Sequence, residues 1–303
     1  EIYDDLFPSR KEGINAWISI MRGCDKFCTF CIVPFTRGRE RSRSISSIVK
    51  EAKSILKSGY QEITLLGQNV NSYKTPEGDF PVLLDKLGKI KSIKRIRYTS
   101  PHPRDIDEEL LKIMAKHDNI CNQIHLPLQA GSSRILKRMN RTYTKEEFLN
   151  LVDLIKKYIP DCGLSTDIIV GFPGETEEEF QETLEVVSKV KFDTAFMFKY
   201  SSRPGTKASH YTDHISEDIK QQRLQTLIEF QQNISLMNNR RRIGLNLDVL
   251  IEKESKKSKS QWAGRIENNV WVIFDKKDGY KIGDIVNVNI IDAQGITLFG
   301  NIN

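Results

Sequence analysis

Three of the five cysteines, Cys24, Cys28 and Cys31, lie within eight residues, with the spacing C-x3-C-x2-C. So tight a group is unsuited to a disulfide framework and is typical of metal binding or catalysis in a reducing compartment. Buried structural thiols are one alternative. Structural zinc is another, but it needs four ligands and would require a distant fourth, such as His102 or Cys121. A 4Fe-4S cluster needs one ligand per iron, so three thiolates leave one iron open for a substrate. The spacing favours the cluster.

Four arginines follow the cysteines at alternate positions: Arg37, Arg39, Arg41 and Arg43. In an extended segment alternate side chains point to the same side. We therefore expect a basic stripe beside the cysteine loop that contacts RNA phosphates or another anionic substrate. The alternative is an ordinary solvated face.

The bulk composition is that of a globular protein with a mildly basic surface. The chain has 303 residues, 39% of them hydrophobic and 28% charged, with a formal net charge of +6. Its longest apolar runs fall short of the roughly 18 residues that span a bilayer. We expect a cytoplasmic monomer that does not bind membranes, for which a nucleic-acid partner is permitted but not required. Residues 1–13, which do not begin with Met, are predicted to be a linker from a missing N-terminal domain.

Six apolar segments alternate with helical patterns between residues 14 and 240. The predicted strands are 14–22, 62–69, 95–100, 122–131, 163–176 and 192–201. The predicted helices are 44–59, 105–118, 144–158, one that begins at Thr176, and 216–242. Capping boxes are predicted for three of them, formed by Asp105 with Glu108, Thr144 with Glu147, and Thr176 with Glu179. Such alternation predicts a parallel sheet covered by helices, and about 200 residues is short for eight units. We expect an α/β fold, a six-stranded open (βα)6 partial TIM barrel, whose strands present their carboxyl ends to one shared mouth.

The pattern changes to short strands separated by Gly, Asn, Asp and Lys over residues 241–303. This predicts a small all-β barrel. Lys256, Lys257 and Lys259 are candidate RNA contacts. Trp262 and Tyr280 are expected to be exposed for base stacking, whereas core packing is preferred for Trp271.

The cysteine spacing, placed directly after the first strand of a six-fold βα domain, resembles the radical S-adenosylmethionine superfamily. Phe30, the aromatic residue before the last cysteine, fits the pattern of that superfamily. Several longer segments are similar to the MiaB-type tRNA methylthiotransferases, and the similarity runs from Ile14 to the C-terminus. They are "GCDKFCTFCIVPFTRGRERSR", "LLGQNVNSY", "RYTSPHPRD", "HLPLQAGSSRILKRMNRTYT", "STDIIVGFPGET" and "FKYSSRPGTKA". The terminal β-domain resembles the TRAM domain of this family.

The resemblance implies an enzyme, a transferase, with a defined set of cofactors and partners. Cys24, Cys28 and Cys31 would hold a 4Fe-4S cluster that binds S-adenosylmethionine and cleaves it to a 5′-deoxyadenosyl radical. The reaction would add a methylthio group to C2 of N6-isopentenyladenosine in the anticodon stem-loop of tRNA, with electrons from a donor such as flavodoxin. The family carries a second 4Fe-4S cluster in its N-terminal domain. The remaining cysteines, Cys121 and Cys162, are expected to be buried and cannot form that site.

Candidate cofactor contacts follow the other strands. The expected S-adenosylmethionine contacts are Phe30, Gln68, Asn69, Ser100, Gln129, Asp167 and Gly171. Gln68 stands where the superfamily usually has an acid; the alternative is that it belongs to a plain turn. Asp167 fits a buried structural carboxylate as well as it fits a cofactor contact. A superfamily pattern at this strand is G-x-I-x-G-x-x-E. Ile169 and Gly171 fit it, but the acid, Glu175, lies one position later than the pattern places it. His125 is predicted to be a satisfied core residue, and Arg203, after the sixth strand, is expected to cover the mouth and contact RNA.

Three other functions stay open from the sequence. A methylthiotransferase could instead act on threonylcarbamoyl-adenosine in tRNA or on an aspartate of a ribosomal protein. A remote alternative of another class is a zinc-stabilised RNA-binding protein without enzymatic activity.

Overall fold

Six parallel strands form an open barrel in the computed structural model, which describes residues 13–303. The expected linker therefore lies outside the described residues except for Gly13. The strands are β1 (Asn15–Ser19), β4 (Glu62–Leu66), β7 (Arg95–Tyr98), β8 (Gln123–His125), β9 (Gly163–Val170) and β10 (Thr194–Lys199). They form two three-stranded sheets, β1-β4-β7 and β8-β9-β10, joined where Ile96 pairs in parallel with Ile120. Within residues 13–303 no ladder joins β1 to β10, which confirms the six-stranded open barrel.

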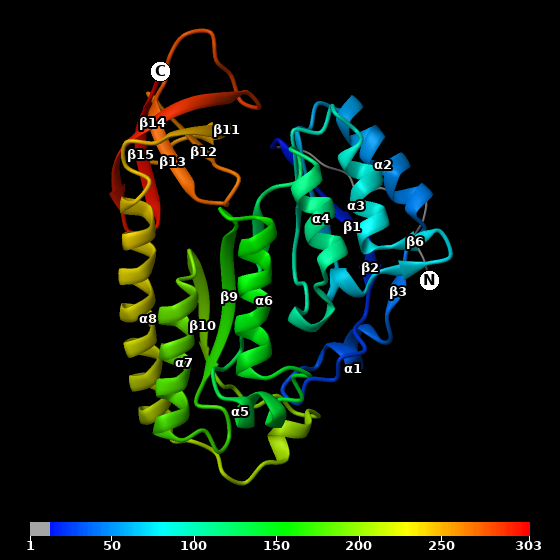
Figure 1. Ribbon diagram of the computed structural model, residues 1–303, viewed down its shortest axis with the longest axis vertical. Helices are drawn as coiled ribbons and strands as arrows, with labels where there is room; N and C mark the ends of the chain where they lie inside the picture. Colours follow the sequence, from blue (N-terminus) through cyan, green and yellow to red (C-terminus); the bar gives the residue numbers. More distant parts are fainter. Residues whose placement is uncertain (1–12) are drawn as a thin grey trace.

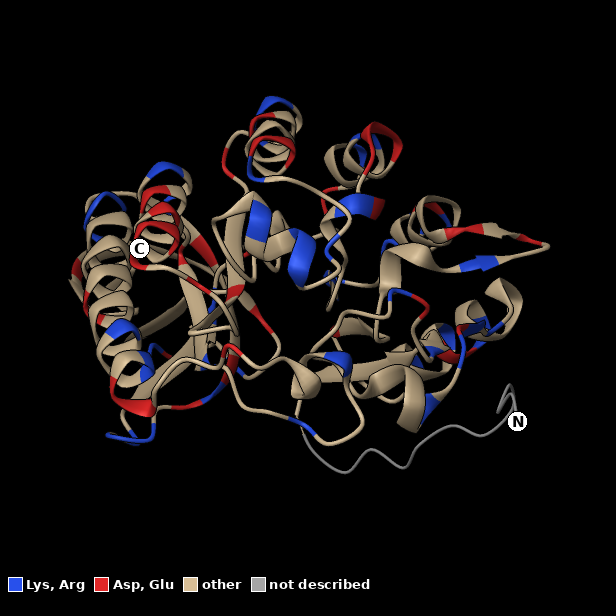
Figure 2. Cartoon of the chain, turned by 90° about the horizontal axis from the view of Figure 1, so that it is seen from below, with Lys and Arg blue, Asp and Glu red and all other residues tan. Residues whose placement is uncertain are grey.

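Helices cover the outer face of this barrel, and Figure 2 shows them arranged around the curved strands. The covering helices are α2 (Ile45–Lys57), α3 (Phe80–Gly88), α4 (Glu108–Lys116), α6 (Lys145–Tyr158), α7 (Glu177–Val190) and α8 (Glu217–Arg240). Two short helices, α1 (Val33–Arg37) and α5 (Ser133–Arg138), lie instead at the carboxyl end of the strands. The predicted capping boxes of α6 and α7 are confirmed. The predicted cap of α4 is wrong: Asp107 accepts the Leu110 N–H at 2.9 Å, while Asp105 ends a 3-10 turn, Pro103–Asp105.

Shorter elements lie between the six long strands. β2 (Met21–Arg22) pairs with β3 (Arg41–Ser42), and β5 (Lys74–Thr75) pairs with β6 (Gly78–Asp79). Two further 3-10 turns are Val70–Ser72 and Lys207–His210. The strand expected over 122–131 is only three residues long as β8. Pro127, which lacks an N–H, and Gln129, with φ of +68°, prevent a regular ladder there.

Strand residues alternate between the helices and the barrel interior. Ile63 and Leu65 of β4 are fully buried against the helices. Trp17 of β1 and Phe196 of β10 point the other way and stay about half exposed, at 51% and 56%. The interior is therefore not filled with side chains as in a closed eight-stranded barrel.

The C-terminal segment forms a closed five-stranded barrel, as predicted. Its strands are β11 (Asn246–Glu254), β12 (Gln261–Arg265), β13 (Trp271–Asp275), β14 (Ile285–Gln294) and β15 (Thr297–Ile302), closed in the order β11-β12-β13-β15-β14. Tyr280 is exposed as expected, but Trp262 is half-buried against the barrel core. Trp271 is also half-buried, with the Lys253 ammonium 4.4 Å from its ring centre.

This β-barrel docks on the amino ends of the parallel strands, at the opposite end of the molecule from α1 and α5 (Figure 1). Glu62, fully buried at the start of β4, binds Arg97 at 3.0 Å and Arg265 of β12 at 2.9 Å. Arg95 donates to the Asp248 carbonyl oxygen at 3.0 Å. The two guanidinium partners compensate the cost of burying the Glu62 carboxylate. Because Arg265 belongs to the β-barrel, these contacts fix the orientation of the β-barrel on the (βα)6 barrel. In residues 13–303 no helix combines the length and the hydropathy needed to cross a bilayer.

Candidate active site

The cysteine loop follows β1 at the carboxyl end of the barrel and is fixed by neighbouring elements. The Gly23 N–H donates to Oε1 of Gln68, just after β4, at 2.7 Å. The Cys24 N–H donates to the Gly38 carbonyl at 3.2 Å, and the Thr29 N–H donates to the Met139 carbonyl at 2.9 Å. Because these partners come from three separate segments, the loop keeps its shape through tertiary contacts.

The three thiols lie in one neighbourhood and are half-buried. Burial raises the pKa of Cys24 to about 11, and Cys28, Glu40 and Cys31 add to the rise while the Lys26 N–H opposes it. Burial also raises the pKa of Cys31, again with a contribution from Cys28. Because burial and the neighbouring sulfurs disfavour the thiolates of Cys24 and Cys31, a bound metal cation would favour their ionised form.

This arrangement fits a 4Fe-4S cluster better than a zinc ion. A structural zinc ion takes four protein ligands, whereas three thiolates suffice for a 4Fe-4S cluster with one open iron. Cys121 is fully buried near Arg95, Arg97 and Glu62, at the other end of the barrel, so it cannot complete a zinc site with the loop.

A buried arginine beside Cys28 supports the same conclusion. Arg141 is only 9% exposed, and its Nη1 lies 3.3 Å from Cys28 Sγ. No carboxylate within residues 13–303 pairs with it; its other partners are the Tyr143 hydroxyl and the Pro127 carbonyl. A buried cation requires an anion, and a metal-bound thiolate at Cys28 provides one.

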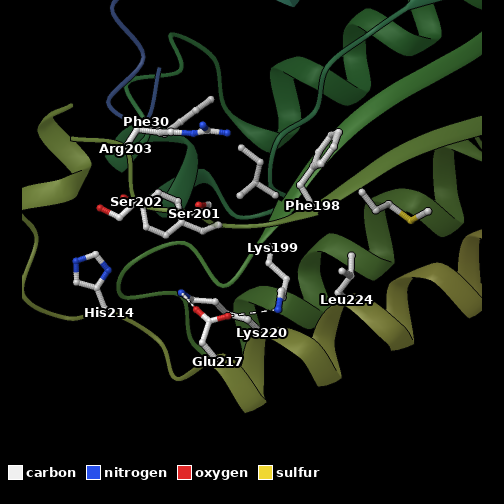
Figure 3. Close-up of a pocket in the computed structure, with 13 residues that line it drawn as sticks. Phe30, Phe198, Lys199, Ser201, Ser202, Arg203, His214, Glu217, Lys220 and Leu224 are labelled. Atoms are coloured by element: carbon white, nitrogen blue, oxygen red, sulfur yellow. Dashed lines mark hydrogen bonds and ion pairs between the residues drawn. The ribbon is translucent and has the colours of Figure 1, made fainter. Parts of the chain in front are cut away.

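A pocket of about 710 Å³ opens next to the loop, between the end of β10 and the start of α8. Phe30 of the loop lines it, with Ile169 of β9 and the segment Lys199–Arg203 after β10. Figure 3 shows Glu217 of α8 between Lys199 and Lys220, at 3.3 and 2.8 Å. The volume suits a nucleoside-sized cofactor, and the lining combines aromatic rings with a few charged groups.

A second cavity of about 310 Å³ lies inside the barrel. It is lined by the inward-facing side chains of Trp17, Phe196 and Asp167 together with Ser100 and His125. His125 Nδ1 forms a hydrogen bond of 3.0 Å with Ser165 Oγ, and its Nε2 lies 3.2 Å from Oδ2 of Asp167. His125 is thus satisfied, as predicted, but it faces the cavity and is only partly buried.

The residues predicted to bind the cofactor do not all meet. Phe30 lines the pocket beside β10, and Ser100 and Asp167 line the interior cavity. Both side-chain atoms of the Asn69 amide are used inside the protein, by Asp105 at 3.0 Å and the His102 N–H at 3.1 Å. The Asn69 side chain therefore holds the loop after β7, and a cofactor contact through its backbone stays a prediction.

The remaining predicted contacts shape the turns. Gln129 continues the ladder of β9 through the Asp167 carbonyl at 2.8 Å and the Ile169 N–H at 2.9 Å. Gly171 has φ of +67°, and its N–H donates to Glu175 Oε2 at 2.7 Å. Burial raises the pKa of Glu175 to about 7, although the Gly171 N–H and Arg223 act against the rise. Glu175 thus closes its own turn and does not point at the pocket.

Only three of the four arginines predicted to form a basic stripe are exposed on the surface. Arg37, Arg39 and Arg41 are exposed beside the cysteine loop. Arg43 is a correction: its guanidinium turns inward and binds Glu51 at 2.7 Å and the Ser19 carbonyl at 2.9 Å. The alternation fails because the segment is not extended throughout; it includes the end of α1, a turn at Gly38 and then β3.

The other predicted RNA contacts are exposed but lie apart. Arg203 is at the rim of the pocket. Lys256, Lys257 and Lys259 are in the loop between β11 and β12, in the barrel that docks at the opposite end. Sequence reasoning gave no role at the site to Arg141, Trp17, Lys220 or Glu217. Arg141 stands in the quoted motif "RMNRTYT", but only the fold reveals that it faces Cys28.

The cysteine loop at the carboxyl end of an open (βα)6 barrel defines a class, the radical S-adenosylmethionine enzymes, and the sequence pattern of the Radical SAM superfamily matches residues 18–187. The TRAM domain pattern matches residues 240–302. The chain belongs to the radical SAM family whose curated members are named tRNA-2-methylthio-N(6)-dimethylallyladenosine synthase.

Two such relatives illustrate the similarity. The protein of Parabacteroides distasonis is 50% identical over 99% of this chain and 67% of its own length. That of Porphyromonas gingivalis is 47% identical over 100% of this chain and 66% of its own length. The chain thus spans about two thirds of the length of these relatives.

Solved structures share the fold at low identity. The radical S-adenosylmethionine methyltransferase TsrM from Kitasatospora setae superposes with a TM-score of 0.55 at 18% identity, over 65% of this chain and 39% of its own. Coproporphyrinogen III oxidase (HemN) from Escherichia coli superposes with a TM-score of 0.52 at 15% identity, over 84% of this chain and 67% of its own.

Proposed function

We propose that this protein is a transferase that adds a methylthio group to C2 of N6-isopentenyl- (dimethylallyl-) adenosine beside the tRNA anticodon. The observation that carries the proposal is the cysteine loop at the carboxyl end of the first strand, next to a pocket of about 710 Å³. Relatives that are 50% identical over 99% of the chain carry the name of this activity.

Cys24, Cys28 and Cys31 would hold a 4Fe-4S cluster, with its fourth iron left for S-adenosylmethionine. When bound, cluster and S-adenosylmethionine supply reductive cleavage of the sulfonium and a 5′-deoxyadenosyl radical. The chain's own part is to position the thiols and to keep water from them. The hydrogen bonds to Gln68, Gly38 and Met139 position the loop that carries the thiols, and half-burial of the thiols helps to keep water away.

The pocket beside β10 is our candidate for the nucleoside part of S-adenosylmethionine. Phe30 offers an apolar ring edge, while the exposed Ser201 and Arg203 offer hydrogen-bond donors. The closed turn at Gly171 leaves its backbone near Lys220 of α8, since a Cβ there would lie 2.4 Å from the Lys220 side chain. Gln68 and Gln129 would act through the loops they fix, and Ser100 and Asp167 would face a base that has left its stack and entered the barrel interior.

The tRNA would meet the protein at the carboxyl mouth through Arg37, Arg39 and Arg41, with Arg203 at the rim. The loop of Lys256, Lys257 and Lys259 would bind a second stretch of phosphates. The two basic regions lie at opposite ends of the barrel, so one RNA reaching both must run along its length. We propose residues 14–240 as the radical domain with its trailing helix and 241–303 as the RNA-binding domain.

Further proposals concern partners and location. A low-potential one-electron donor such as flavodoxin would reduce the cluster, and a second 4Fe-4S cluster in an N-terminal domain would provide sulfur. We propose a monomer that works in the cytoplasm, without a membrane partner, where tRNA is found.

Mass spectrometry of tRNA nucleosides tests the proposal. Cells that lack the gene should lose 2-methylthio-N6-isopentenyladenosine and accumulate N6-isopentenyladenosine. The wild-type gene and the matched control Cys162→Ala should restore the modified nucleoside, whereas Cys28→Ala should not. Unchanged tRNA in the deleted strain would overturn the tRNA assignment. Threonylcarbamoyl-adenosine in other tRNAs and the ribosomal-protein aspartate would then be measured in the same strains.

A further inference from the structure

The end of α5 and the turn that follows it, residues 138–143, hold the cysteine loop through hydrogen bonds. The Thr29 N–H donates to the Met139 carbonyl at 2.9 Å, and the Thr29 hydroxyl donates to the Arg138 carbonyl at 3.0 Å. The Asn140 amide donates to the carbonyls of Lys26 and Phe27 at 3.1 and 2.9 Å. These bonds hold the backbone on both sides of Cys28, so the turn and the loop form one unit.

Arg141 reaches from this turn to the sulfur of Cys28. Its Nη1 is 3.3 Å from Cys28 Sγ, its Nε donates to the Tyr143 hydroxyl at 3.0 Å, and its Nη2 is 3.4 Å from the Pro127 carbonyl. The Tyr143 hydroxyl lies 2.8 Å from the Pro127 carbonyl and 3.1 Å from that of Leu128. The guanidinium is therefore fixed in one plane by neutral groups, and one of its N–H bonds is left to point at sulfur.

The buried guanidinium of Arg141 lacks an acidic partner in the described part of the chain. An N–H⁺···S⁻ bond in a site of low dielectric is stronger than one between neutral groups, and it strengthens as the sulfur gains electron density. Hydrogen bonds to the sulfurs are one of the factors that set the reduction potential of an iron–sulfur cluster.

We propose that Arg141 is a positioning residue that donates a charged hydrogen bond to the Cys28 thiolate and thereby raises the reduction potential of the cluster. The inference rests on the proposed function, because it requires a cluster on Cys28. The electron balance is simple: an external one-electron donor is oxidised, and the cluster gains one electron. Arg141 neither gains nor loses a proton, since a guanidinium stays cationic throughout.

A redox titration of the reconstituted full-length protein, followed by EPR, tests this inference. The signal to follow is the one that changes when S-adenosylmethionine is added. The variants are Arg141→Met, which removes the donor, and Arg141→Lys, which keeps the charge. Arg138→Met is the matched control: it removes a charge from the same turn, where Arg138 pairs with Asp213 and touches no thiol. Iron and sulfide per chain are measured in every sample.

We expect Arg141→Met to lower the ratio of reduced to oxidised cluster at a fixed potential by about tenfold, which is 59 mV for a one-electron couple. Arg141→Lys should shift the midpoint in the same direction by less, and Arg138→Met should not shift it. A normally loaded Arg141→Met with the wild-type midpoint would overturn the inference. If that variant does not load iron, Arg141→Lys decides: a smaller negative shift supports the role, and an unchanged midpoint refutes it. A wild-type protein that holds no cluster would instead overturn the proposed function.

Discussion

The Gly23 N–H donates a hydrogen bond of 2.7 Å to the side-chain oxygen of Gln68, and this contact joins the loops after the first and second strands. Gln68 stands where the sequence predicts a cofactor contact. Because its Oε1 faces Gly23, the residue determines where the cysteine loop begins. The loop that would carry the cluster thus depends on a contact between residues 45 positions apart.

Gly23→Ala should disturb this loop strongly. Gly23 has φ of +82°, and a Cβ there would lie 2.1 Å from the Arg39 carbonyl oxygen, which is backbone and cannot swing away. We expect the variant to bind less than half the iron of the wild type after reconstitution, measured by iron analysis. The matched control is Gly59→Ala, with φ of +88° and open space around the Cβ, which should cost only about 1 to 2 kcal/mol and keep its iron. Equal iron content in both variants would contradict this reading.

Arg97→Met should weaken the junction between the two barrels. Arg97 is buried, binds Glu62 at 3.0 Å and donates to the Glu267 carbonyl of the β-barrel at 2.7 Å. Its loss leaves a buried carboxylate with one guanidinium fewer, so we expect the free energy of unfolding to fall by about 3 kcal/mol.

Calorimetry provides the measurement, and the β-barrel should melt earlier than the rest of the chain. Lys116→Met, which removes a surface partner of Asp85, should change stability by less than about 1 kcal/mol. The prediction fails if both variants melt alike.

Arg39→Gln combined with Arg41→Gln should weaken tRNA binding and make it less dependent on salt. Both side chains are exposed beside the cysteine loop. Each lost phosphate contact should reduce the slope of log K against log salt by roughly 0.7 to 0.9. Filter binding at several salt concentrations measures the slope. The double variant Lys112→Gln and Lys189→Gln removes the same charge from exposed positions of α4 and α7 and should leave the slope unchanged. An unaltered slope in the arginine variant would place the RNA elsewhere.

His102 should make stability depend on pH. Burial, followed by Arg141, Lys26 and Arg104, lowers the pKa of His102 to about 2. The folded protein therefore keeps this imidazole neutral, while the unfolded chain takes up a proton below about pH 6.5. The stabilisation is complete above pH 6.5 and is lost as the pH falls, by about 2 kcal/mol at pH 5.

Urea unfolding at pH 7 and pH 5 tests this dependence. His102→Gln keeps an acceptor for the Arg104 N–H, which His102 Nδ1 accepts at 3.2 Å, but it does not titrate. The difference in unfolding free energy between the two pH values should be about 2 kcal/mol larger for the wild type. Identical differences would show that His102 becomes protonated without cost.

The sequence alone determined the repeating βα architecture, the closed β-barrel and the cysteine loop, since these depend on hydrophobic periodicity, capping residues and local spacing. The capping boxes at Thr144 and Thr176 are local interactions and were predicted correctly. The cap at Asp105 was not, because Pro103 starts a 3-10 turn that moves the cap of the helix two residues on, to Asp107.

Only the tertiary structure decided what faces the loop. The Asn69 amide binds Asp105 and the His102 N–H. The Arg43 guanidinium turns inward to Glu51, and the Arg141 guanidinium contacts Cys28, which is 113 residues away in the sequence. None of these contacts follows from spacing along the chain, because each depends on which loops the strand order brings together. The docking of the β-barrel at the amino ends of the strands was equally beyond sequence reasoning. It depends on Glu62, whose guanidinium partners come from both barrels: Arg97 from β7 and Arg265 from β12.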